Sequence, residues 1–323
     1  MIRIYLAKVK ISSWRGDWQH GFQFCYYFNM KTSLHKILTE DNIELPGLLY
    51  EPEVPTETVL VHVHGMAGNF YENKFLDAIA ESLTSNGIAF YVFNNRGTEF
   101  IKDMYRVGKE KREIVRLGDT YEKFEDCLID IKAAIDFVES KGFKQIHLSG
   151  HSLGGPKVAY YAADSGDKRV VSVIFLSPAD MVGLAKADKD LERDISTAKT
   201  MIAEGRGHDI MPFIIWGDCI LSADTYMSLT NESGEVAIFN FHKPEDKLLV
   251  LGKIEIPSLT AMGRKDHVVI IPIEDIMRRI KESIVLSPKV ETKILGNADH
   301  GYNGYEKDLA ETIKDWLLEN LPA

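Results

Sequence analysis

A serine between small residues is the first feature of this sequence that could carry out chemistry. Ser152 lies in the segment Gly150-His151-Ser152-Leu153-Gly154-Gly155, which matches the pattern GxSxG. Glycines on both sides leave room for a sharp strand-to-helix turn that exposes the serine hydroxyl. A hydroxyl is a weak nucleophile near neutral pH, so it needs an adjacent base that is oriented by a third group. The pattern predicts a nucleophilic serine if a histidine and an acid join it.

Two downstream segments supply this base and acid. Asp266 lies in GRKDHVV, directly after a predicted strand at 256–262, and His300 lies in NADHGY, after a predicted strand at 290–295. The carboxyl ends of parallel strands meet at one edge of a sheet, so these loops can converge on Ser152. The order serine, acid, histidine is that of a known triad arrangement. We therefore predict Asp266 as the acid and His300 as the base.

Other residues compete for the same roles. Asp180 follows a predicted strand at 170–176 and is the second candidate for the acid. His267 is adjacent to Asp266 and would have to turn the other way, Asp299 is next to His300 and is not expected to face its ring, and His242 lies in the region interpreted below as a lid. Asp266 and His300 are favoured because each lies in a loop directly after a predicted strand and can take the required chemical role.

Backbone N–H groups must stabilise the oxyanion that forms during such a reaction. The expected donors are Leu153, which follows the nucleophile, and Met66, in the loop HGMAGN after a predicted strand at 58–64. In that strand His62 and His64 share one face, which could indicate a metal site. No third ligand with suitable spacing lies nearby, so we expect no metal.

The elements that must position these residues follow from the hydrophobic periodicity. Short runs rich in β-branched residues alternate with segments of helical period, which predicts an α/β fold with a mostly parallel sheet covered on both faces. Strands are expected at 34–38, 43–50, 58–64, 88–93, 145–149, 170–176, 256–262 and 290–295. Helices are expected at 73–85, 121–140, 153–163, 273–284 and 305–321.

Three regions are expected along the chain. Residues 32–179 and 251–323 form the core, and residues 180–250 form an insertion that is first charged and then apolar and aromatic. A stretch of that length inside a domain is usually functional, so we interpret it as a cap or lid. For residues 1–31, an N-terminal extension, two interpretations stay open: a segment without fixed structure, or an extra helix packed on the core.

Composition excludes several classes of protein. Among 323 residues, 45% are hydrophobic and 27% charged, and the net charge of −10 disfavours nucleic acid or an anionic membrane as the main partner. Cys25, Cys127 and Cys219 form no CxxC pair, so we expect no disulfide framework, a reducing compartment and a cytoplasmic location. No segment reaches the roughly 18 apolar residues of a membrane span.

Taken together, the motifs HVHGMAGN, FNNRG, GHSLGG, LSPAD, GRKDHVV and ADHGY resemble the α/β-hydrolase superfamily over residues 32–321. The sequence is most similar to its serine esterase, lipase and acylglycerol-hydrolase groups, and also to the family that includes siderophore esterases. The resemblance implies an eight-stranded sheet, no cofactor and acyl-enzyme chemistry. Two departures leave the subfamily open: Met66 interrupts the HGGG pattern of one group, and Asn95 replaces the usual acid before Arg96.

The expected function is hydrolysis of carboxylic esters of small molecules. An acyltransferase or an amidase or peptidase with the same triad stays open, as does a non-catalytic binding protein on the same fold. The apolar residues at 211–216 and 226–227 indicate either an apolar substrate moiety or internal packing.

Overall fold

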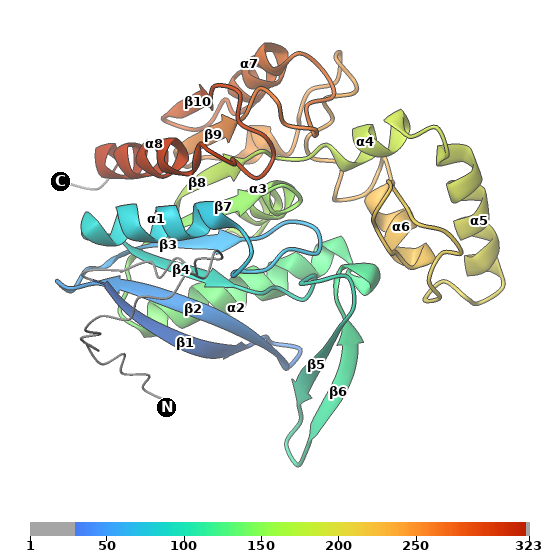
Figure 1. Ribbon diagram of the computed structural model, residues 1–323, viewed down its shortest axis with the longest axis horizontal. Helices are drawn as coiled ribbons and strands as arrows, with labels where there is room; N and C mark the ends of the chain where they lie inside the picture. Colours follow the sequence, from blue (N-terminus) through green and yellow to red (C-terminus); the bar gives the residue numbers. More distant parts are fainter. Residues whose placement is uncertain (1–29, 321–323) are drawn as a thin grey trace, which may run out of the picture.

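A ten-stranded sheet with helices on both faces forms the centre of the molecule (Figure 1). The computed structural model describes residues 30–320. Its strands are β1 (Met30–Leu38), β2 (Ile43–Pro52), β3 (Thr58–Val63), β4 (Ala89–Phe93), β5 (Lys102–Val107), β6 (Arg112–Leu117), β7 (Gln145–His151), β8 (Val170–Leu176), β9 (Ser258–Met262) and β10 (Val290–Ile294). Their order is β10-β9-β8-β7-β3-β4-β2-β5-β6, and β1 pairs with β2. The six strands from β10 to β4 run parallel, and the other four pair antiparallel.

Eight helices and three single 3₁₀ turns complete the described part of the chain. The helices are α1 (Lys74–Ser85), α2 (Cys127–Ser140), α3 (Gly154–Asp164), α4 (Met181–Ala187), α5 (Leu191–Ala203), α6 (Ala223–Leu229), α7 (Ile273–Ser283) and α8 (Glu306–Glu319). The 3₁₀ turns are η1 (Asp119–Tyr121), η2 (Phe124–Asp126) and η3 (Leu251–Lys253).

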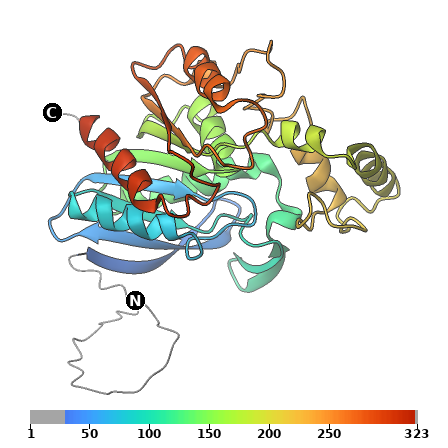
Figure 2. The same ribbon diagram turned by 45° about the horizontal axis from the view of Figure 1, so that its top comes forward.

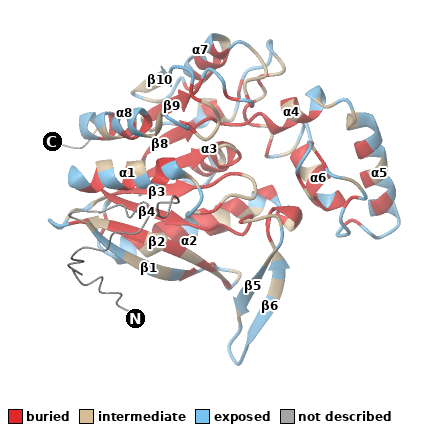
Figure 3. Ribbon diagram, in the orientation of Figure 1, coloured by how far each residue is buried: buried red, intermediate tan, exposed pale blue. Residues whose placement is uncertain are grey.

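The sequence-based fold prediction is confirmed in class, with one correction in strand number. All eight predicted strands are present, but the sheet has ten because β5 and β6 form an additional antiparallel hairpin. This hairpin projects from the sheet and is largely exposed on both sides (Figures 1 and 3). Only Met104 of its residues is buried, so the hairpin shows little alternation of apolar and polar residues and periodicity did not detect it.

The central strands are buried on both faces, as their near-continuous apolar sequences predict. Every residue of β4 and β9 is buried, as Figure 3 shows for the middle of the sheet. Helices α1 and α8 pack together on one face, and α2, α3 and α7 pack on the other. In α1 the buried side chains recur at helical spacing and turn one stripe toward the sheet: Phe75, Leu76, Ile79, Ala80 and Leu83.

Residues 180–250, called the insertion below, lie between β8 and β9 and contain α4, α5 and α6. Both ribbon views show these helices beyond the carboxyl ends of the parallel strands (Figures 1 and 2). Hydrogen bonds to two segments of the core help to hold the insertion in place. Thr120 Oγ1 donates to Ile220 O at 2.5 Å, and the Arg279 guanidinium of α7 donates to four backbone carbonyls between residues 240 and 246. The end of the insertion is therefore held against α7.

A buried ion pair lies beneath the helix that follows Ser152. Lys157 of α3 donates to Glu122 Oε1 at 2.6 Å, and both side chains are almost completely buried. Burial raises the pKa of Glu122, and the neighbouring Lys157 opposes that rise. The pair is costly to break because removing one partner leaves the other charge buried without compensation.

Replacing Lys157 by methionine is expected to lower the free energy of unfolding by about 3–5 kcal/mol. The double variant Lys157→Met/Glu122→Leu removes both charges and is expected to recover much of this loss. Urea denaturation at neutral pH measures how far the free energy of unfolding of each variant differs from that of the unsubstituted protein. A single variant as stable as the unsubstituted protein would contradict this account of the pair.

Two of the three cysteines lie within residues 30–320. Cys127 and Cys219 are free, buried thiols, whereas Cys25 and the rest of residues 1–29 lie outside the described residues. The predicted N-terminal extension at 1–31 is thus described only from Met30, where β1 begins. Within residues 30–320, no helix is both long and apolar enough to cross a membrane.

Candidate active site

Ser152 occupies a sharp turn between β7 and α3. Its φ of 57° is in the left-handed region, which is uncommon for a non-glycine residue and fits a strained strand-to-helix turn. A side chain on Gly150 would lie 2.0 Å from Gly154 O, and one on Gly154 would lie 2.2 Å from Val63 O. Both glycines are therefore required by close backbone contacts, which is the reason that the sequence pattern suggested.

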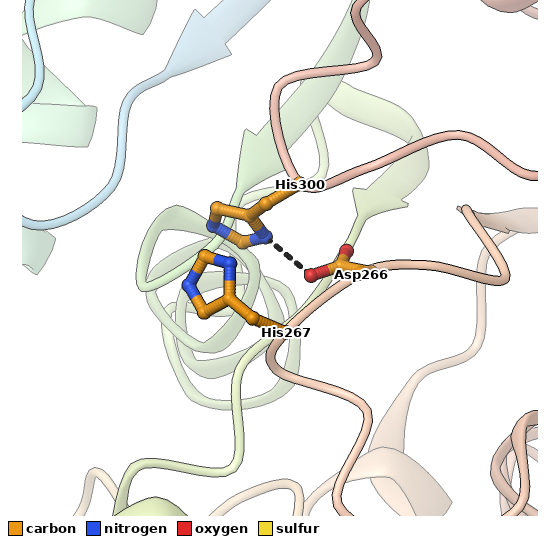
Figure 4. Close-up of side chains that lie close together, drawn as sticks. All are labelled: Asp266, His267 and His300. Atoms are coloured by element: carbon orange, nitrogen blue, oxygen red, sulfur yellow. Dashed lines mark hydrogen bonds and ion pairs between the residues drawn. The ribbon is translucent and has the colours of Figure 1, made fainter.

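An Asp–His pair lies in the loops that follow β9 and β10. His300 Nδ1 is 2.8 Å from Asp266 Oδ1, and the Asp266 side chain is fully buried while that of His300 is 18% exposed (Figure 4). Burial raises the pKa of Asp266, but the hydrogen bond from His300 and the other hydrogen bonds outweigh it, and the pKa lies below its usual value. The ionised carboxylate can only accept, so Nδ1 carries the proton and Nε2 is left as a base.

The loop of His300 is attached to the serine turn through His151. His151 Nε2 lies 2.8 Å from His300 O, and the two rings are 4.6 Å apart. Because a carbonyl only accepts, His151 donates this bond from Nε2. Sequence reasoning missed His151, since nothing in the motif reveals that its ring reaches the loop after β10. Among residues 30–320, the Ser152 hydroxyl itself makes no hydrogen bond, so the serine–histidine contact is not formed in this structure.

The predicted oxyanion donors lie beside this serine. A side chain on Gly65 would lie 2.6 Å from Ser152 Cβ and 3.2 Å from the Leu153 amide nitrogen, so the two loops touch. Within the described residues, neither the Leu153 nor the Met66 amide donates a hydrogen bond. The Leu153 amide at the start of α3 and the Met66 amide of the facing loop, both free and next to Ser152, suit a developing negative charge.

Replacing Gly65 by alanine is expected to lower kcat for ester hydrolysis by about 10²–10³-fold, the usual effect of losing one oxyanion donor. The added methyl group would push the Met66 loop away from Ser152, because its nearest neighbours include the backbone of His151 and Leu153. Steady-state kinetics test the effect, and thermal unfolding separates it from a loss of folding. Unchanged kcat in a folded variant would argue against this oxyanion site.

The competing acid and bases form their own contacts. His242 Nδ1 lies 2.7 Å from Asp180 Oδ2, so the second candidate acid pairs with a histidine of the insertion and also caps α4. Asp299 accepts from the Asn303 amides. His267 is exposed, and its ring centroid lies 4.4 Å from that of His300 (Figure 4).

The two histidines of β3 have structural partners. His62 Nδ1 lies 2.9 Å from Ser149 Oγ, and His64 lies between Gly65 O and the Asn95 amide. Both are buried, and burial lowers the pKa of each to about 3. Each ring is thus neutral and engaged with its own neighbours.

A family model described as "Protein of unknown function (DUF1749)" matches residues 125–323, more than half of the chain. The chain belongs to this family. No curated protein matches the sequence.

Solved structures similar to this DUF1749 member share its fold. Est1E from Butyrivibrio proteoclasticus, solved with ferulic acid bound, is 20% identical, with a TM-score of 0.62, covering 88% of this chain and 98% of that one. The Pyrococcus furiosus esterase Pf2001 is 16% identical with a TM-score of 0.58, covering 90% and 91%. The α/β hydrolase GrgF from Penicillium sp. sh18 is 17% identical with a TM-score of 0.61, covering 90% and 97%. The chain therefore has the α/β-hydrolase fold, as its motifs indicated.

Proposed function

We propose that this chain is a serine hydrolase that cleaves carboxylic esters of small molecules through an acyl-enzyme intermediate. The observation that carries the proposal is Ser152 in a left-handed turn between strand and helix, with the Asp266–His300 pair in the loops after β9 and β10 at the same edge of the sheet. The fold is shared with proteins named as esterases, which is consistent with this chemistry. At such low identity the likeness supports the fold alone, so the chemistry rests on the residues.

In the proposed reaction Ser152 Oγ attacks the ester carbonyl carbon while His300 Nε2 takes the hydroxyl proton. Asp266 holds the imidazole and stabilises its positive charge, and the Leu153 and Met66 amides bind the oxyanion. The C–O bond to the alcohol then breaks, and His300 returns the proton to the leaving oxygen. Water repeats the sequence on the acyl-enzyme and releases the acid. The mechanism uses no cofactor.

We also propose that the insertion acts as a cap over this site. Its Cys219 Sγ lies 3.5 Å from Met66 Sδ, which brings the insertion to the oxyanion loop. Phe213, Trp216 and Met227 are half-buried and pack against the core. Apolar side chains of this kind suit an ester with an apolar moiety.

The free thiols of Cys127 and Cys219 are consistent with a reducing, cytoplasmic location.

The proposed function can be tested with an active-site probe and a substrate series. A fluorophosphonate should label the native protein at Ser152 and leave heat-denatured protein unlabelled. A series of p-nitrophenyl esters of increasing chain length should then give saturable hydrolysis. Absence of both labelling and turnover would favour a non-catalytic binding protein. Faster cleavage of amides, or acyl transfer to an added alcohol, would identify the other reactions on this triad.

A further inference from the structure

We propose that Asp266, His267 and His300 form a binding site for a zinc ion, and that zinc bound there switches off the proposed hydrolase. The three residues come from the loops after β9 and β10 and turn their polar atoms toward one another (Figure 4). One ligand atom from each residue lies within 4.8 Å of the others. The binding goes beyond the proposed function, whereas the inhibition rests on it.

The geometry needs only small adjustments to hold the ion. Zinc bonds of 2.0–2.2 Å to nitrogen and oxygen place the ligands of a tetrahedral site about 3.3–3.6 Å apart. His300 Nδ1 and Asp266 Oδ1 are 2.8 Å apart, so an ion that takes the place of their shared proton would part them only slightly. His267 is exposed, and its ring can turn toward them at little cost. Water can complete the fourth position.

The donor set selects the kind of ion. Two imidazole nitrogens and one carboxylate oxygen suit zinc better than magnesium or calcium, which prefer oxygen ligands. Two more carboxylates, Asp218 of the insertion and Asp299, add negative charge at the site. Both raise the pKa of His267, although burial lowers it more. A divalent cation is therefore attracted by charges beyond its own ligands.

Zinc at this position would remove the base. In the active tautomer His300 carries its proton on Nδ1, donates it to Asp266 and leaves Nε2 free for the serine proton. When zinc occupies Nδ1, the one proton of the neutral ring must lie on Nε2. Nε2 can then no longer accept the Ser152 proton. No bond to the substrate is involved, so a chelator should restore activity fully.

Direct binding can be measured without turnover. Isothermal titration of zinc chloride into Ser152→Ala protein is expected to show one site, and His267→Ala in the same background should weaken it by at least about 10–100-fold. Mutation of a residue that only hydrogen-bonds to a metal ligand typically weakens metal binding about 10–100-fold, and His267 is proposed as a ligand itself. His208→Ala, which removes another exposed histidine, is the matched control and should bind as before. Equal zinc affinity with and without His267, or no site at all, would overturn the proposal.

Inhibition is measured separately in the protein with Ser152 intact. Zinc should slow fluorophosphonate labelling, EDTA should reverse the effect, and magnesium should have none. In His267→Ala protein the zinc concentration for half-inhibition, relative to that variant's own uninhibited rate, should rise by at least the same 10–100-fold. Binding without slower labelling would overturn the switch. An unlabelled protein that still binds zinc through His267 would instead refute the proposed function and leave the metal site standing.

Discussion

Replacing Ser152 by alanine is expected to lower kcat for p-nitrophenyl ester hydrolysis by about 10⁴–10⁶-fold. Loss of a triad nucleophile has this effect because the residual rate comes only from oxyanion stabilisation and substrate binding. Alanine differs from serine only by the hydroxyl, so the turn at φ 57° should persist. Steady-state kinetics, together with the loss of fluorophosphonate labelling, measure the change.

Ser177 provides a matched control for this variant. It also has a left-handed backbone, with φ 45°, and follows β8, the strand next to β7. Its hydroxyl is buried and lies 2.8 Å from Tyr302 Oη, so it is not available to a substrate. Ser177 also hydrogen-bonds Asp266 and helps to lower its pKa, so Ser177→Ala is expected to lower kcat, but far less than Ser152→Ala does. If Ser152→Ala kept the original rate while Ser177→Ala lost it, the nucleophile would have been assigned to the wrong turn.

Replacing Asp266 by asparagine is expected to lower kcat by about 10³–10⁴-fold with little change in KM. The amide can present its NH₂ group to His300, which drives the ring proton from Nδ1 to Nε2 and removes the base. The variant is nearly isosteric, so the fold should be retained, as thermal unfolding would verify. Because the pKa of Asp266 is below its usual value, the carboxylate is ionised throughout the neutral range.

Asp180→Asn is the control that separates the two acids. Asp180 lies 2.7 Å from His242, and Asp266 lies 2.8 Å from His300. The two Asp–His pairs therefore have similar geometry and differ mainly in where they lie in the fold. Since Asp180 caps α4 and holds His242 within the insertion, its loss should change KM or stability more than kcat. A greater fall in kcat for Asp180→Asn than for Asp266→Asn would reassign the acid to Asp180.

The sequence predicted the core elements well because each has a strong local pattern. Strand β8 has the predicted bounds, Val170–Leu176, and α7 begins at the predicted residue, Ile273. The hairpin of β5 and β6 was missed because most of both its faces is exposed. Helices α4 and α6 of the insertion were missed for another reason: each has only seven residues, too few for a periodic stripe to be recognised.

The sequence by itself determined which residue types end neighbouring strands and in what order. A serine between glycines follows one strand, and the acid and the histidine follow two others. Because the carboxyl ends of parallel strands lie at the same edge of a sheet, this order predicts that the three residues meet at that edge. Tertiary structure decided the pairing. Asp180 and Asp266 both follow strands, and only folding brings His242 to the first and His300 to the second. The contacts of His151 and His267 with His300 were likewise decided by the fold, because they depend on loops that meet across the sheet and carry no mutual signal along the chain.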